Sequence, residues 1–190
     1  MCSRMKPFKK RIFTVPNQLT FLRLGFLPFF IIAIHYGRYS IALGLLIAAG
    51  ISDGLDGLLA RKLNQKTALG AYLDPIADKV MQSSSYLVLA WNRKIAWWLA
   101  IMVLGHDGLI LVACTAIILT VGFRPFPPSI FGKANTTCEI LLVVTVIVLA
   151  IFPNPYLLLA KKIGSYIVAC LVMLSGVHYS VVVARRLESE

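Results

Sequence analysis

Six long apolar runs, separated by short polar or Pro-rich segments, are the strongest constraint on what this chain can fold into. Each run is close to the length, about 20 residues, of a helix that crosses the hydrocarbon core of a bilayer. Only helices and closed barrels span bilayers, and runs this long and continuous exclude barrel strands. The sequence therefore predicts an all-α integral membrane protein with six transmembrane helices, over roughly 18–36, 39–60, 68–91, 95–122, 133–152 and 156–184.

The composition agrees with this prediction. Of the 190 residues, 58% are hydrophobic and only 14% are charged, whereas soluble domains are about 45–50% apolar and about 25% charged. An ordinary soluble domain is excluded, and so is a disordered chain, which would be less hydrophobic and more charged. The predicted organisation is a basic juxtamembrane arm over 1–16, a helical domain over 17–184 and a polar tail over 185–190.

The net charge of +11 is interpreted as a membrane property, and no nucleic-acid partner is expected. Lys and Arg gather in the arm, in the 61–66 and 124–133 loops and in the tail. Cytoplasmic loops carry such an excess, and basic residues near the membrane meet anionic lipid head groups. The pattern predicts that both termini lie in the cytoplasm. The expected location is the inner (plasma) membrane of a bacterium, with an organelle inner membrane as the alternative.

Four acidic residues fall within 26 residues, each in or beside an apolar run: Asp53, Asp56, Asp74 and Asp78. Acids inside a membrane are costly and indicate a functional site. The i, i+3 and i, i+4 spacings put each pair on one helix face, and an antiparallel hairpin brings both pairs to the same depth. Four converging carboxylates repel each other unless cations bind them. All-oxygen ligands suit Mg²⁺, Mn²⁺ or Ca²⁺, and two such ions clamp phosphoryl oxygens in many transfer sites.

The acids belong to a longer pattern, DxxDGxxAR followed by an eight-residue spacer and GxxxDxxxD, which residues 53–78 match at every fixed position. This segment resembles the signature of the CDP-alcohol phosphotransferase family. The resemblance implies six helices, a homodimer, and transfer of a phosphatidyl group from CDP-diacylglycerol to an alcohol, with release of CMP. It also implies two Mg²⁺ or Mn²⁺ ions on Asp53, Asp56, Asp74 and Asp78, with Asp78 as the general base. The implied CDP-binding residues are Gly57, Ala60, Arg61 and Gly70.

The acceptor alcohol is predicted from shorter motifs. The NxxTxxRxxxxP segment over 17–28 is similar to that of phosphatidylglycerophosphate synthases and the related cardiolipin synthases. The first prediction is therefore glycerol 3-phosphate as acceptor. Its dianionic phosphate needs additional donors, and the candidates are Arg23, Arg124, Lys133 and His106.

Two positions keep other acceptors open. His106 stands where relatives usually have Arg, and a packed structural role for this histidine is an equal alternative. Asn135, in place of the more usual Lys, favours the cardiolipin synthase pattern, in which phosphatidylglycerol is the acceptor; another alcohol is a further alternative. A small ion transporter is the alternative from a different class. It is disfavoured because the acids lie near one membrane face and no inverted repeat is apparent.

Overall fold

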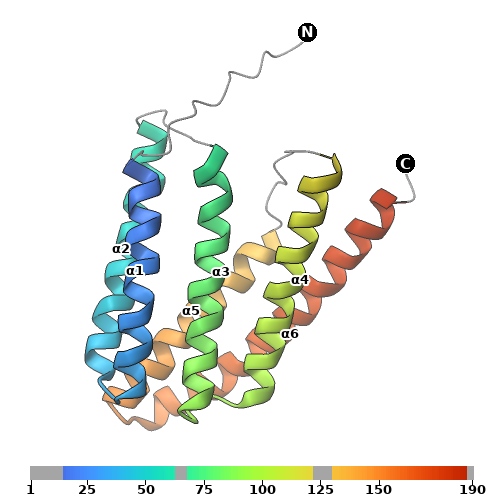
Figure 1. Ribbon diagram of the computed structural model, residues 1–190. Helices are drawn as coiled ribbons and strands as arrows, with labels where there is room; N and C mark the ends of the chain where they lie inside the picture. The colour runs from blue at the N-terminus through green and yellow to red at the C-terminus, as the bar shows by residue number, and fades with distance from the viewer. Residues whose placement is uncertain (1–14, 63–67, 122–129, 188–190) are drawn as a thin grey trace. The chain divides into compact units, whose positions relative to one another are not determined.

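The computed structural model describes residues 15–62, 68–121 and 130–187, with side chains at 22, 24–52, 76–112, 132 and 134–177. Every regular element in these ranges is an α-helix (Figure 1). The helices are α1 (Val15–His35), α2 (Tyr39–Lys62), α3 (Ala68–Trp91), α4 (Trp97–Val121), α5 (Ile130–Ile151) and α6 (Pro155–Leu187).

The predicted all-helical class is confirmed, and the helix ends differ from the predicted runs by a few residues. α1 begins at Val15, before the predicted run, with Pro16 in its first turn, where a missing backbone N–H costs no helix hydrogen bond. α6 continues to Leu187 and so includes Arg185 and Arg186, which the sequence analysis assigned to the tail. Residues 1–14 of the arm lie outside the described residues.

Two helices within the described residues are long and apolar enough to cross a membrane, over 134–151 in α5 and 155–177 in α6. Only 33% and 11% of these windows are buried. A core helix of a soluble protein would be mostly buried, so this exposed apolar surface fits a lipid environment. The apolar stretches of α1, α2 and α4 are shorter within the described residues. Six membrane crossings and cytoplasmic termini stay predictions.

The chain divides into two compact units, and the division falls inside α3 between Met81 and Gln82. In unit 1, α1 packs against α2, and Phe30, Ile34 and Ala42 are buried. Gly37 joins the two helices in a left-handed conformation, with φ 70°. The N–H of Gly37 donates to the carbonyl of Ile34 and that of Arg38 to Ala33, which is the Schellman pattern that ends many helices.

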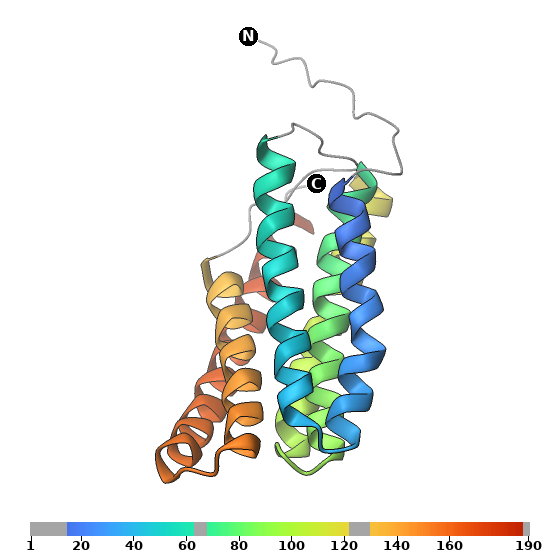
Figure 2. The ribbon, with the colours of Figure 1, turned by 90° about the vertical axis from the view of Figure 1, so that its left-hand side faces the viewer.

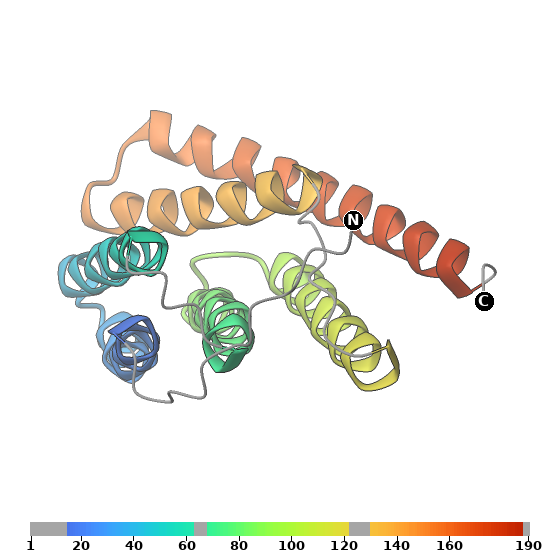
Figure 3. The same cartoon turned by 90° about the horizontal axis from the view of Figure 1, so that it is seen from above.

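Unit 2 contains the rest of α3 and the three later helices, and α6 packs against both α4 and α5. α5 and α6 run side by side (Figure 3). Asn154 starts α6 because its side-chain oxygen accepts the N–H of Tyr156 at 2.8 Å, as an N-cap residue does. Gly164 lets α6 approach α5 closely, since a Cβ there would lie 3.2 Å from Leu142 Cδ1.

Candidate active site

The four acids of the family signature lie on α2 and α3, as predicted. Asp53 and Asp56 are in the C-terminal half of α2, and Asp74 and Asp78 are in the N-terminal half of α3. α2 ends and α3 begins at the same end of unit 1, and the two helices run in opposite directions (Figures 1 and 2). The five residues 63–67 connect them.

The helical rise gives the depth of each acid along its helix. Asp56 lies six residues before the end of α2 and Asp74 six residues after the start of α3, which is about 9 Å in each case. Asp53 and Asp78 lie nine and ten residues from the same ends, or about 14 Å and 15 Å. These distances from the helix ends are similar for the two helices, and the pairing of the acids across them stays a prediction.

Pro75 stands between the two acids of α3. Proline has no backbone N–H, so the carbonyl four residues earlier loses its helical partner. That carbonyl belongs to Ala71, which shares a helix face with Asp74 and Asp78. The chain thus has one carbonyl without its usual helical partner in the turn that carries Asp74.

The structure describes the side chain of one further predicted site residue, and only the backbone of most others. The side chain of Asp78 is exposed. Asp53, Asp56, Asp74, Gly57, Ala60, Arg61 and Gly70 have helical backbones, and Arg23 and Lys133 lie in α1 and α5. Their side chains are outside the described set, and Arg124 lies outside the described residues altogether. Convergence of these groups on CDP and an acceptor is untested.

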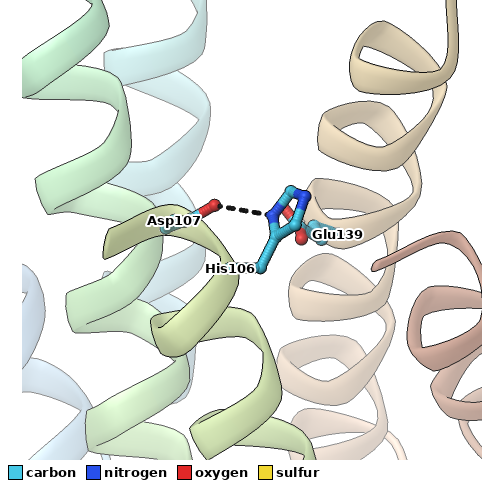
Figure 4. A group of neighbouring side chains, drawn as sticks. All are labelled: His106, Asp107 and Glu139. Carbon is cyan, nitrogen blue, oxygen red and sulfur yellow. Dashed lines mark ion pairs between the residues drawn. The ribbon is translucent and has the colours of Figure 1, made fainter. Parts of the chain in front are cut away.

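His106 is the predicted acceptor-binding candidate whose surroundings are described. It is buried in α4, 6% exposed, and lies beside the buried carboxylates Asp107 and Glu139 (Figure 4). His106 Nδ1 is 3.5 Å from Asp107 Oδ1. These three residues are called here the α4–α5 polar cluster.

Hydrogen bonds hold the two carboxylates of the cluster in place. Glu139 accepts the side-chain amides of Gln82 on one oxygen and Asn135 on the other, the latter at 2.8 Å. Ser83 donates to Asp107 at 3.3 Å. Residues from α3, α4 and α5 therefore meet around this cluster, and all of them belong to unit 2.

Sequence reasoning did not single out Glu139 or Gln82. The available signal was that Glu139 is an acid inside an apolar run, which marks a functional candidate in a membrane helix. Its partners are remote in sequence, since Gln82 is 57 residues away. No local spacing connects them.

The chain is similar in sequence to one family model and to several known proteins. The family model described as CDP-alcohol phosphatidyltransferase matches residues 13–177. A putative cardiolipin synthase of Mycobacterium tuberculosis is 33% identical over 131 residues, covering 67% of this chain and 61% of the relative. Human cardiolipin synthase (CMP-forming) is 32% identical over 155 residues, covering 73% of this chain and 52% of the relative.

A probable phosphatidylglycerophosphate synthase of Mycobacterium tuberculosis is 34% identical over 134 residues, covering 67% of this chain and 63% of the relative. The matches thus span less than two thirds of the length of these relatives. The family model covers most of this chain, and the acids of the family signature lie on two consecutive helices. The chain belongs to the CDP-alcohol phosphatidyltransferase family.

Proposed function

We propose that this chain transfers a phosphatidyl group from CDP-diacylglycerol to an alcohol at the cytoplasmic face of a bacterial inner membrane. The acceptor hydroxyl oxygen forms a bond to the lipid-linked phosphorus, and the bond from that phosphorus to CMP breaks. The observation that carries the proposal is the placement of the four acids on α2 and α3, at matched depths of about 9 Å and about 14–15 Å from the helix ends.

The donor set fits the two divalent ions that the family implies. Asp53, Asp56 and Asp74 would hold Mg²⁺ or Mn²⁺ together with Asp78, because carboxylate oxygens are the ligands these ions prefer. When bound, the ions supply positive charge that neutralises the pyrophosphate and stabilises CMP as the leaving group. Arg61 lies about 7.5 Å further along α2 than Asp56, where it would bind the nucleotide with Gly57, Ala60 and Gly70.

Asp78 is the proposed general base. Its side chain is exposed, and a residue that takes a proton from a substrate hydroxyl must be within reach of that hydroxyl. A carboxylate there accepts the proton while the hydroxyl oxygen attacks phosphorus.

We propose phosphatidylglycerol as the acceptor, which makes the product cardiolipin. The relatives named cardiolipin synthase support this choice, and so does His106. Its neighbours Asp107 and Glu139 are carboxylates, which would repel the dianionic phosphate of glycerol 3-phosphate. Phosphatidylglycerol carries a monoanionic phosphodiester instead, which the carboxylates would repel less.

Glycerol 3-phosphate stays the second candidate, because a probable phosphatidylglycerophosphate synthase is about equally similar to the chain. In that case Arg23, Arg124 and Lys133 would bind the phosphate, without help from His106. A homodimer is proposed from the resemblance to the family.

The test is CMP release by purified protein from CDP-diacylglycerol with Mg²⁺, with each acceptor offered alone. Release with phosphatidylglycerol, and none with glycerol 3-phosphate, is the expected result. The reverse result would identify a phosphatidylglycerophosphate synthase. EDTA should abolish release and excess Mg²⁺ or Mn²⁺ should restore it, whereas undiminished release in EDTA would contradict the role of the metals.

A further inference from the structure

The α4–α5 polar cluster has a donor set unlike that of the four acids of unit 1. It combines one imidazole with two carboxylates, and its candidate ligand atoms all lie within 4.8 Å of one another. His106 and Asp107 come from α4 and Glu139 from α5 (Figure 4). All three are buried.

Both ring nitrogens of His106 are buried and neither has a hydrogen-bond partner. A buried polar group without a partner costs about 1–3 kcal/mol, so such a side chain calls for an explanation. α6 lies near the ring, since a Cβ on Gly176 would be 4.0 Å from His106 Cδ2. A metal ion bound to one ring nitrogen would give that nitrogen a partner.

Hydrogen bonds from neighbouring side chains orient the carboxylates, as they do for the ligands of known kinds of metal site. The amides of Gln82 and Asn135 donate to the two oxygens of Glu139. A carboxylate oxygen has two lone pairs, so it can accept a hydrogen bond and bind a metal at the same time. Outer hydrogen bonds of this kind orient ligands in metal sites.

Charge supports a divalent ion. Burying carboxylates in a low-dielectric interior is expensive unless positive charge accompanies them. One divalent ion carries a charge equal and opposite to that of two carboxylates, so it would offset the cost of burying them.

We propose that His106, Asp107 and Glu139 bind one divalent transition-metal ion, of which Zn²⁺ fits best, through a ligand set that includes none of the four acids. Zn²⁺ binds imidazole nitrogen and carboxylate oxygen at about 2.0–2.2 Å, and three protein ligands leave one position for water. Tetrahedral ligands at such distances are about 3.4 Å apart. The 4.8 Å span therefore needs small side-chain rotations to close. The imidazole disfavours Mg²⁺, which prefers oxygen ligands.

The first experiment measures zinc in full-length protein purified in detergent, loaded with Zn²⁺ and dialysed against Mg²⁺-containing buffer. Wild type should retain about one equivalent per chain. His106→Gln and Glu139→Gln should lose it, whereas His35→Gln, which alters an exposed histidine, should retain it. Asp56→Asn should also retain it, because that change affects only the four acids.

The second experiment does not depend on the folding of any variant. X-ray absorption at the zinc edge of loaded wild type should show nitrogen and oxygen ligands, with the outer-shell scattering of an imidazole ring. Retention of zinc by His106→Gln would overturn the proposal, as would absence of imidazole scattering or failure of wild type to hold zinc. Removing an outer donor, in Asn135→Ala, should weaken zinc binding by about 10–100-fold.

Discussion

At the scale of single residues, Asp78 is the position on which the proposed chemistry depends most directly. Asp78→Asn should lower the rate of CMP release by about 10²–10⁴-fold, because an amide cannot accept the proton. CDP-diacylglycerol binding should persist, since the change conserves shape. Glu188→Gln, which removes a negative charge from the tail, should leave the rate unchanged. Wild-type turnover in Asp78→Asn would exclude the general-base role.

Two residues with left-handed backbone make a matched pair. Gly37 has φ 70° and Arg93 has φ 55°, and Arg93 also ends a helix, with its N–H donating to Ala90 and that of Lys94 to Leu89. The left-handed conformation costs a residue with a Cβ about 1–2 kcal/mol. Gly37→Ala should therefore destabilise the protein by about 1 kcal/mol.

Arg93→Gly should have the opposite effect and stabilise the protein by about 0.5–1 kcal/mol. Thermal unfolding in one detergent, followed by circular dichroism, measures both changes. Equal shifts in the same direction would show that strain at these positions does not determine stability.

The site could be predicted from sequence only where its residues are close in sequence. Asp53 and Asp56 are one turn apart, as are Asp74 and Asp78, so helical spacing alone groups them. Glu139 meets His106 and Gln82 only because three helices pack together, and no local pattern encodes that packing. Tertiary contacts between distant residues therefore carry the part of the chemistry that the sequence analysis missed.

At the scale of helices, the contact of α5 with α6 depends on a small residue. Gly164→Leu should destabilise unit 2 by about 1–3 kcal/mol through overpacking, because even a Cβ would lie 3.2 Å from Leu142 Cδ1. Leu142→Ala combined with Gly164→Leu should recover part of the loss. A double-mutant cycle on unfolding midpoints tests this coupling, and strict additivity of the two changes would contradict it.

The helices themselves followed closely from the apolar runs, because a hydrophobic stretch of this length has few alternatives to helix in a membrane. The positions of the helix ends were predicted less closely than the helices themselves. Proline fits the first turn of a helix as well as a loop, so Pro16 did not reveal that α1 starts at Val15. The basic residues Arg185 and Arg186 were assigned to a polar tail because they are charged. In the structure they continue α6 without a break.

At the scale of the whole molecule, orientation in the membrane is the property to test. The excess of Lys and Arg predicts that the α5–α6 turn faces away from the cytoplasm and that the C-terminus faces into it. In a cysteine-free background, a membrane-impermeant maleimide should label Asn154→Cys in intact cells. It should label Ser189→Cys only after permeabilisation. The reverse pattern would invert the topology and move the four acids to the opposite face.

The boundary between the two compact units falls within one uninterrupted helix. Asp78 and Gln82 stand on either side of it, four residues apart, and a helix turns by about 100° for each residue. Losing or gaining a single residue between them would rotate one side chain by about 100° about the helix axis relative to the other. The number of residues in this turn of α3 therefore sets the angle between the two side chains about the helix axis.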